Sequence, residues 1–185
     1  MTATQSLPTS AVAKVLVPVV VGAAISVSLG VYAKTHTPTG IAVSVAGFSS
    51  PLTVKVWLAS GAAFFAVLQL ITALVMYGKV PGVTAPSWIG AAHRWPGRIA
   101  FLLTIPVAVH CLYALGFQDY DTRVLVHSLL GCVFFGVFTV KMLFLTRRGL
   151  AGWALPLAGG LVFATLIGLW LTSSLWFFTT VGVKF

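Results

Sequence analysis

The chain has 185 residues, of which 59% are hydrophobic and only 7% are charged, and its mean hydropathy is +1.05. Soluble domains carry about 25% charged and roughly 45–50% apolar residues, so this composition excludes a soluble enzyme and a disordered segment. Eleven basic residues against two acidic ones give a formal charge of +9. No basic run or basic helix face suited to nucleic acid is present. The composition therefore predicts an integral membrane protein in a lipid bilayer, with no nucleic-acid partner.

Five stretches are long and apolar enough to cross a bilayer, which requires roughly 20 residues per helix. Their continuous rather than alternating hydrophobicity favours helices over a barrel. The first is longer than the apolar run of a signal peptide, so we expect it to remain in the protein. We predict an all-α bundle with a mobile tail at 1–13 and a single transmembrane domain at 14–185, with spans at about 15–33, 52–77, 92–116, 122–145 and 155–180.

The basic residues predict an orientation, because cytoplasmic loops hold the excess of Lys and Arg. One side of the predicted bundle carries Lys14, Lys79, Arg94, Arg98, Arg147 and Arg148. The other side carries Lys34, Lys55, Arg123 and Lys184, with Asp119 and Asp121 beside Arg123. We therefore expect a multi-pass protein of the cell inner (plasma) membrane, with its N-terminus inside and its C-terminus outside.

Two histidines fall inside the predicted spans, where ionisable residues are costly and are candidates for function. His110 lies six residues before the end of the third span, a rise of about 9 Å. His127 lies five residues into the fourth span, a rise of about 7–8 Å. Because the two spans are antiparallel and joined by a short stretch, both imidazoles are expected at one depth in the outer half of the bilayer. Two such histidines suit the axial ligation of one haem iron.

Directly packed helices are about 8–10 Å apart, so a haem between these two spans would have to wedge them apart. Alternatively, only one of the histidines is a ligand. Gly131 and Arg123 each lie about 40° from His127 around the helix. Gly131 would let a flat macrocycle approach the backbone, and Arg123 is placed to pair with a haem propionate. Glycine is also ordinary in membrane helix packing.

The remaining polar residues within or near the spans have both plain and functional interpretations. His93 opens the third span beside two arginines and is either an interfacial residue or a cofactor ligand. Lys141 either extends to the head groups or faces a polar site with Gln69 and Thr72, where a quinol head group would find hydrogen-bond partners. His36 is expected to be a solvated loop residue.

Two short motifs resemble a known family. His127-Ser128-Leu129-Leu130-Gly131 resembles the His-Ala-x-x-Gly signature that opens a core helix in cytochrome b561 and ferric-reductase-like domains. The stretch from His93 to Arg98 is similar to the His-Arg-x-x-Gly pattern that opens another core helix there, and to a His-Arg element of haem A synthases. The chain is also similar to a family of small, uncharacterised actinobacterial membrane proteins.

The b561 resemblance implies b-type haem held by histidine pairs in a four-helix core, with quinol or ascorbate as electron donor. It implies that His127 ligates an outer haem and His93 an inner one. The second and fifth spans contain no histidine, so we expect one outer haem, with His110 as the partner of His127.

These observations leave three hypotheses. The first is a membrane b-type cytochrome that transfers electrons between quinol and a partner protein. It would be a component of a quinol- or ferric-linked oxidoreductase. The second is a non-catalytic anchor or scaffold subunit of a respiratory complex. The third is a small transporter or channel, which the absence of a carboxylate in mid-span disfavours. A homodimer is compatible with the first two.

Overall fold

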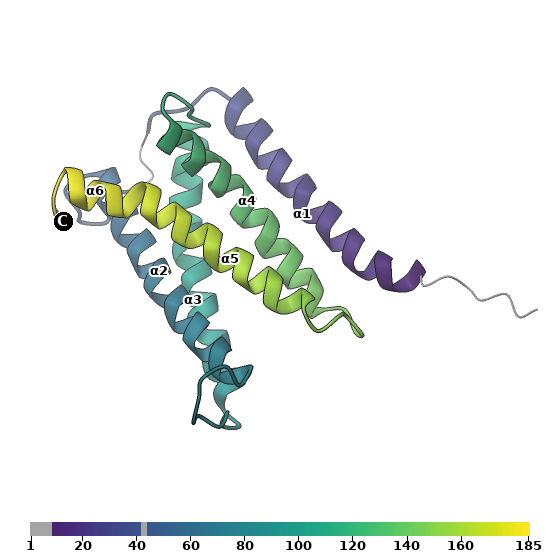
Figure 1. The fold of residues 1–185 in the computed structure, drawn as a ribbon. Helices are drawn as coiled ribbons and strands as arrows, with labels where there is room; N and C mark the ends of the chain where they lie inside the picture. The colour runs from purple at the N-terminus through teal and green to yellow at the C-terminus, as the bar shows by residue number, and fades with distance from the viewer. Residues whose placement is uncertain (1–8, 42–43) are drawn as a thin grey trace, which may run out of the picture.

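The computed structural model describes residues 9–41 and 44–185, and that part of the chain is helical with no strand (Figure 1). The helices are α1 (Thr9–Thr35), α2 (Pro51–Met76), α3 (Ile89–Val109), α4 (Thr122–Leu145), α5 (Ala154–Trp170) and α6 (Trp176–Thr180). Two π-helical segments, η1 (His110–Leu115) and η2 (Leu171–Leu175), follow α3 and α5 directly.

Five helical stretches of the described chain are long and apolar enough to cross a membrane, which confirms the predicted all-α fold. They are Val12–Thr35, Pro51–Met76, Ile89–Leu115, Thr122–Leu145 and Ala154–Thr180. The first helix begins earlier than predicted, because residues 9–13 of the expected tail are helical. Residues 1–8 of that tail lie outside the described part of the chain.

Side-chain caps explain where two of the helices begin. The Ser50 hydroxyl accepts a hydrogen bond from the backbone N–H of Thr53, while the Thr53 hydroxyl accepts one from the backbone N–H of Ser50. This reciprocal capping box satisfies free donors at the start of α2. The carboxylate of Asp121 accepts from the N–H of Val124 at 2.7 Å and caps α4 in the same way.

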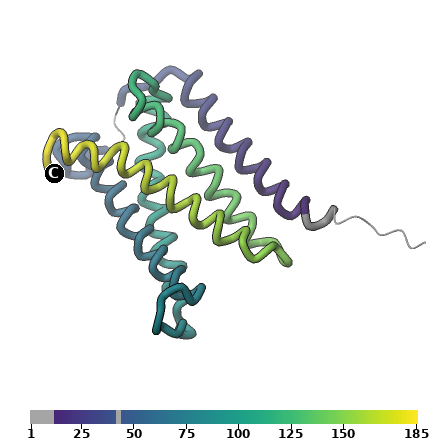
Figure 2. The backbone as a smooth tube through the Cα atoms, viewed as in Figure 1, coloured from purple at the N-terminus to yellow at the C-terminus, as the bar shows by residue number. Residues whose placement is uncertain are grey.

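The helices alternate in direction through the bundle (Figure 2). We call the end where η1 is joined to α4 the His127 end, and the end where α2 is joined to α3 the His93 end. Helices α1, α3 and α5 run toward the His127 end, and α2 and α4 run back. Backbone packing joins α2 to α3, α1 to α4, α4 to α5 and α2 to α5.

Helices α3 and α4 diverge from their short connection instead of packing closely along their length (Figure 1). Aromatic side chains fill the space between them. The rings of Phe101 and Phe138 stack with centroids 3.9 Å apart and planes within 9°. Phe134 is buried beside Ala62 and Ala66 of α2, whose small side chains let these aromatic rings enter the core.

Helix α1 lies on the outer side of α4 and approaches it through small residues. A Cβ atom at Gly22 would lie 2.6 Å from the carbonyl oxygen of Gly136. A Cβ atom at Gly136 would in turn overlap the Gly22 carbonyl and the Ser26 hydroxyl. Because any larger side chain would separate the two backbones, this contact depends on glycine at both positions.

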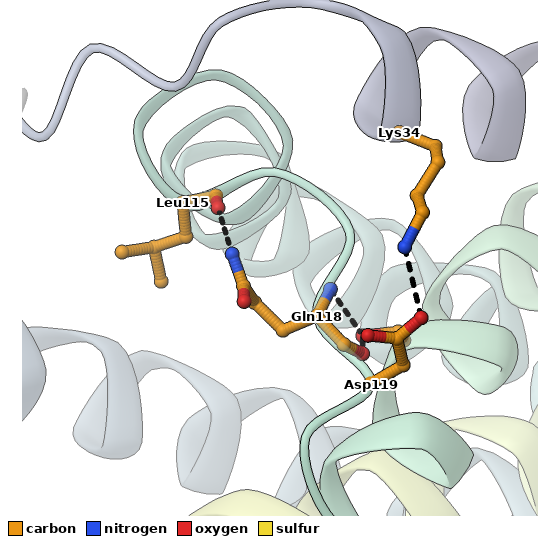
Figure 3. A network of polar contacts seen from close by, with 5 residues as sticks. Lys34, Leu115, Gln118 and Asp119 are labelled. Atoms are coloured by element: carbon orange, nitrogen blue, oxygen red, sulfur yellow. Dashed lines mark hydrogen bonds and ion pairs between the residues drawn. The ribbon is translucent and has the colours of Figure 1, made fainter.

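Polar contacts also tie α1 to the α3–α4 connection at the His127 end (Figure 3). Lys34 forms a 2.8 Å ion pair with Asp119, and the Gln118 amide donates to the Leu115 carbonyl at 2.7 Å. The backbone N–H of Phe117 donates to the Ala33 carbonyl at 2.8 Å. Because the ion pair is exposed, it contributes at most about 1 kcal/mol, and the backbone contact is the firmer tie.

We predict that Gly136→Ala destabilises the protein by about 1–3 kcal/mol, because the added methyl group has no space between α4 and α1. Gly160→Ala is the matched control, since a Cβ atom there meets nothing within 4 Å. The measurement is the apparent melting temperature of the detergent-solubilised protein, followed by tryptophan fluorescence. Equal melting temperatures for the two variants would contradict the close α1–α4 contact.

Candidate functional site

The imidazole of His127 is held by a threonine on the neighbouring helix. Its Nδ1 lies 3.0 Å from the hydroxyl oxygen of Thr172. That hydroxyl donates its single proton to backbone carbonyls of the preceding turn, 2.8 Å from Gly168 and 3.1 Å from Leu169. When the Thr172 proton goes to a backbone carbonyl, the hydroxyl oxygen accepts from the ring, an arrangement that places the proton of His127 on Nδ1 and the lone pair on Nε2.

The same arrangement recurs at the opposite end of the bundle. Nδ1 of His93 lies 3.0 Å from the hydroxyl oxygen of Thr72. The Thr72 hydroxyl is 3.0 Å from the Leu68 carbonyl and 2.9 Å from the Gln69 carbonyl, so its proton is also committed to the backbone. His93 therefore has a protonated Nδ1 and a lone pair on Nε2, as His127 has.

A histidine with this hydrogen-bond pattern is prepared to bind a metal through Nε2. Histidines that ligate metals almost always donate the other ring N–H to a nearby acceptor, which fixes the tautomer and the ring orientation. In His93 and His127 the threonine contact is made by Nδ1, and each ring also interacts with a backbone group of the facing helix, Gln69 for His93 and Leu169 for His127. Sequence analysis identified both histidines, and the structure adds the atom that each presents.

His110 is a mostly buried imidazole, with 7% of its surface exposed. No fully buried polar side-chain atom of the described residues lacks a hydrogen-bond partner, so any ring nitrogen of His110 that is not bonded within the protein lies at the accessible edge of the ring. His110 also opens η1, and short π-helical segments are frequent at functional sites. Thr172, which holds His127, lies in the second such segment, η2.

Positive charge surrounds these two histidines. Lys55 on α2 lies close enough for its ammonium group to act electrostatically on both His110 and His127. The guanidinium of Arg123 donates to the Thr172 carbonyl at 2.8 Å and lies 3.9 Å above the Trp176 ring. Its distance to the Asp121 carboxylate is 3.7 Å. The site therefore favours an anionic group, and the expected presence of Arg123 beside His127 agrees with these contacts.

The structure gives two predicted residues different surroundings from those expected. A Cβ atom at Gly131 would lie 3.9 Å from the Leu169 side chain, an ordinary contact, so packing against α5 does not require glycine there. His36 is not simply solvated: its ring nitrogens lie 3.1 Å from the Tyr32 carbonyl and 2.9 Å from the Tyr113 carbonyl. Its ring also stacks on Tyr32, with centroids 4.5 Å apart, so it links α1 to η1.

Within the described ranges, no group of three or more His, Cys, Asp or Glu side chains is placed to hold a metal ion. The possible ligand set at the His127 end is therefore the pair His110 and His127. Two imidazoles from different helical elements, with Lys55 and Arg123 acting electrostatically on His127, are a donor set that a haem iron and its carboxylates could use.

Sequence reasoning missed Thr172 and the position of Lys55. Thr172 lies 45 residues from His127, and only the packing of α5 on α4 brings them together. One signal was present: Thr72 and Thr172 stand in apolar runs of helices that contain no histidine. Thr72 was considered as a partner of Lys141, whereas the structure places its hydroxyl against His93.

The fold defines a multi-pass helical membrane protein with a pair of histidines at one end of its core. Residues 15–185 match the family described as "Family of unknown function (DUF6529)", and the chain belongs to that family. No match was found among the curated proteins or the solved structures.

We predict that His93 and His127 are both neutral with the proton on Nδ1, because each ring donates to a threonine hydroxyl whose own proton bonds the helix backbone. The measurement is ¹⁵N NMR of histidine-labelled protein without added cofactor. Thr172→Val should shift the signals of His127 alone, and Thr72→Val those of His93 alone. Thr165→Val is the control, since its hydroxyl contacts only the backbone of α5. Protonation on Nε2 in either ring would show that the tautomer is misassigned.

Proposed function

We propose that the protein is a membrane b-type cytochrome that transfers electrons between a quinol and a partner protein. His110 and His127 would hold one haem b at the His127 end. The observation that carries the proposal is the presence of both imidazoles at this end, where Thr172 contacts Nδ1 of His127 and Lys55 acts electrostatically on both rings. The resemblance of the His127 motif to the b561 and ferric-reductase-like signature supports the same assignment.

Each residue of the site has a distinct part in this function. When bound, the haem supplies a centre that accepts and releases one electron at a time. Thr172 orients His127 and keeps its proton on Nδ1, so that Nε2 stays available. Lys55 and Arg123 provide positive charge that offsets the negative carboxylates of such a cofactor.

The sequence raised the objection that directly packed helices leave too little space for a haem between two ligands. Helices α3 and α4 make few close backbone contacts with each other, because α3 packs on α2 while α4 packs on α1 and α5. The stacked rings of Phe101 and Phe138 occupy the space between α3 and α4, so a haem would have to lie nearer to the His127 end than this pair.

The distribution of basic residues supports an orientation in the plasma membrane. The His93 end carries most of the loop and helix-end Lys and Arg residues, which are typical of a cytoplasmic side. We propose that the N-terminus is inside and the His127 end faces outside. The electron-transfer partner then approaches the outer face, next to the haem.

The competing proposal is a non-catalytic anchor subunit of a respiratory complex. Its apolar helices would serve equally well as contacts for lipid or for a partner subunit. The cytochrome is the better supported proposal because Thr172 orients His127 and Lys55 acts electrostatically on both His110 and His127, an arrangement that lipid or subunit packing alone does not require.

We predict that protein produced with an adequate haem supply shows a Soret band and, after reduction, the α-band of a low-spin b haem. His110→Ala and His127→Ala should each abolish or alter this spectrum, because each removes one axial ligand. His36→Gln is the control, since His36 contacts backbone carbonyls and tyrosine rings outside the site. A wild-type spectrum in either alanine variant would remove that histidine from the ligand set, and a colourless wild-type protein would exclude the function.

A further inference from the structure

An apolar groove runs along α4 between α1 and α5, both of which pack on α4 (Figure 1). The groove has a volume of about 400 Å³, and its lining includes no residue of the proposed haem site. It is lined between Val15 and Ser26 on α1, between Gly136 and Phe144 on α4, and between Trp153 and Leu161 at the start of α5. Apart from the Ser26 hydroxyl and the Trp153 indole N–H, the lining side chains are apolar.

The groove is about as long as one leaflet of a bilayer is deep. On α1 its lining extends over the eleven residues from Val15 to Ser26, a rise of about 16 Å. The hydrocarbon core of a bilayer is about 30 Å thick, so one leaflet accounts for about 15 Å. Because the apolar span of α1 begins at Val12, the groove runs from the membrane surface at the His93 end to about mid-bilayer. One acyl chain of a lipid in that leaflet has this length and this apolar character.

Three cations, which we call the rim cations, lie at the mouth of this groove. Lys14 directly precedes Val15 of the lining, and Arg147 and Arg148 lie in the connection between α4 and α5. The Lys14 ammonium reaches that connection, since it lies 3.4 Å from the position that a Cβ atom would take at Gly149. The three positive charges therefore gather on one rim of the groove.

No acidic side chain is near enough to neutralise the rim cations. The chain contains two acidic residues, and both Asp119 and Asp121 precede α4 at the His127 end. There they lie beside Lys34 and Arg123. Because α4 has 24 residues, these carboxylates are about 36 Å away from the rim. Basic residues between transmembrane helices at a membrane surface attract anionic lipid head groups, and this rim has that composition.

We propose that the groove between α1, α4 and α5 binds one anionic phospholipid. The phosphate accepts hydrogen bonds from the rim cations, and one acyl chain occupies the groove. Trp153 is 58% exposed at the mouth and lies at the level of the head groups, where tryptophan is enriched. A zwitterionic lipid offers the same chain, but the rim cations repel its ammonium group. This site goes beyond the proposed function and does not depend on haem.

The test is native mass spectrometry of the full-length protein in detergent, titrated with phosphatidylglycerol and with phosphatidylcholine of the same chains. The wild type should retain one phosphatidylglycerol per chain, with a Kd about tenfold or more below that for phosphatidylcholine, because each basic residue at the head group favours the anion. Replacing all three rim cations by Gln should abolish this preference. The matched control should keep it. It replaces by Gln three cations of the same end that lie outside the groove, namely Lys79, Arg94 and Arg98.

A second pair of variants tests the groove without changing the charge. Ala23 lines the groove and is exposed, so the ring of Ala23→Phe should occupy the place of the acyl chain. Binding of phosphatidylglycerol should weaken by about tenfold or more, because the chain loses buried apolar surface. Ala24→Phe is the matched control, since Ala24 is equally exposed on α1 but does not line the groove. Circular dichroism and size-exclusion chromatography verify that each variant keeps its fold.

Equal affinity of the wild type for the two lipids, or equal loss in the two triple variants, would overturn the proposal. Wild-type binding in Ala23→Phe would overturn it as well. A lipid-free dimer that Ala23→Phe dissociates would assign the groove to a second copy of the chain and would also overturn it. His127→Ala should lose the haem spectrum yet keep the bound phosphatidylglycerol, which separates failure of this site from failure of the proposed function.

Discussion

The hydrogen bond from Nδ1 of His127 to Thr172 determines what the centre of this bundle can do chemically. Inside a bilayer, every polar group must find its partner within the protein, so a threonine in a span donates to its own helix backbone. That internal bond leaves the hydroxyl able only to accept. The ring beside it is consequently fixed in one tautomer, with an unprotonated Nε2. An ordinary hydrogen bond inside a membrane helix thereby leaves His127 with a nitrogen that can bind the haem that we propose.

The same threonine–histidine contact occurs at both ends of the bundle, with Thr172 beside His127 and Thr72 beside His93. A second imidazole, that of His110, belongs to the His127 end, and Lys55 acts electrostatically on both rings there. Because a pair of imidazoles suits a haem iron, we propose the haem at this end.

The sequence was sufficient for the parts of this account that depend on local patterns. Hydropathy placed all five helices within a few residues, because each span must cover the hydrocarbon by itself. The expectation that His110 and His127 share one depth came from counting residues along antiparallel helices, and both residues belong to the end where η1 is joined to α4. The partners of the histidines did not follow, because Thr172 meets His127 through contacts between distant helices. The same holds for His36, whose acceptor on Tyr113 lies 77 residues away.

The amount of haem b per chain tests the central claim most directly. The purified protein, produced with a haem precursor and assayed as its pyridine haemochrome, should contain one haem b per chain. No haem would contradict the assignment of His110 and His127 as axial ligands. Two haems per chain would contradict the single-site account, because a second haem would need ligands other than His110 and His127. Half a haem per chain would place the cofactor between two copies and would contradict ligation within one chain.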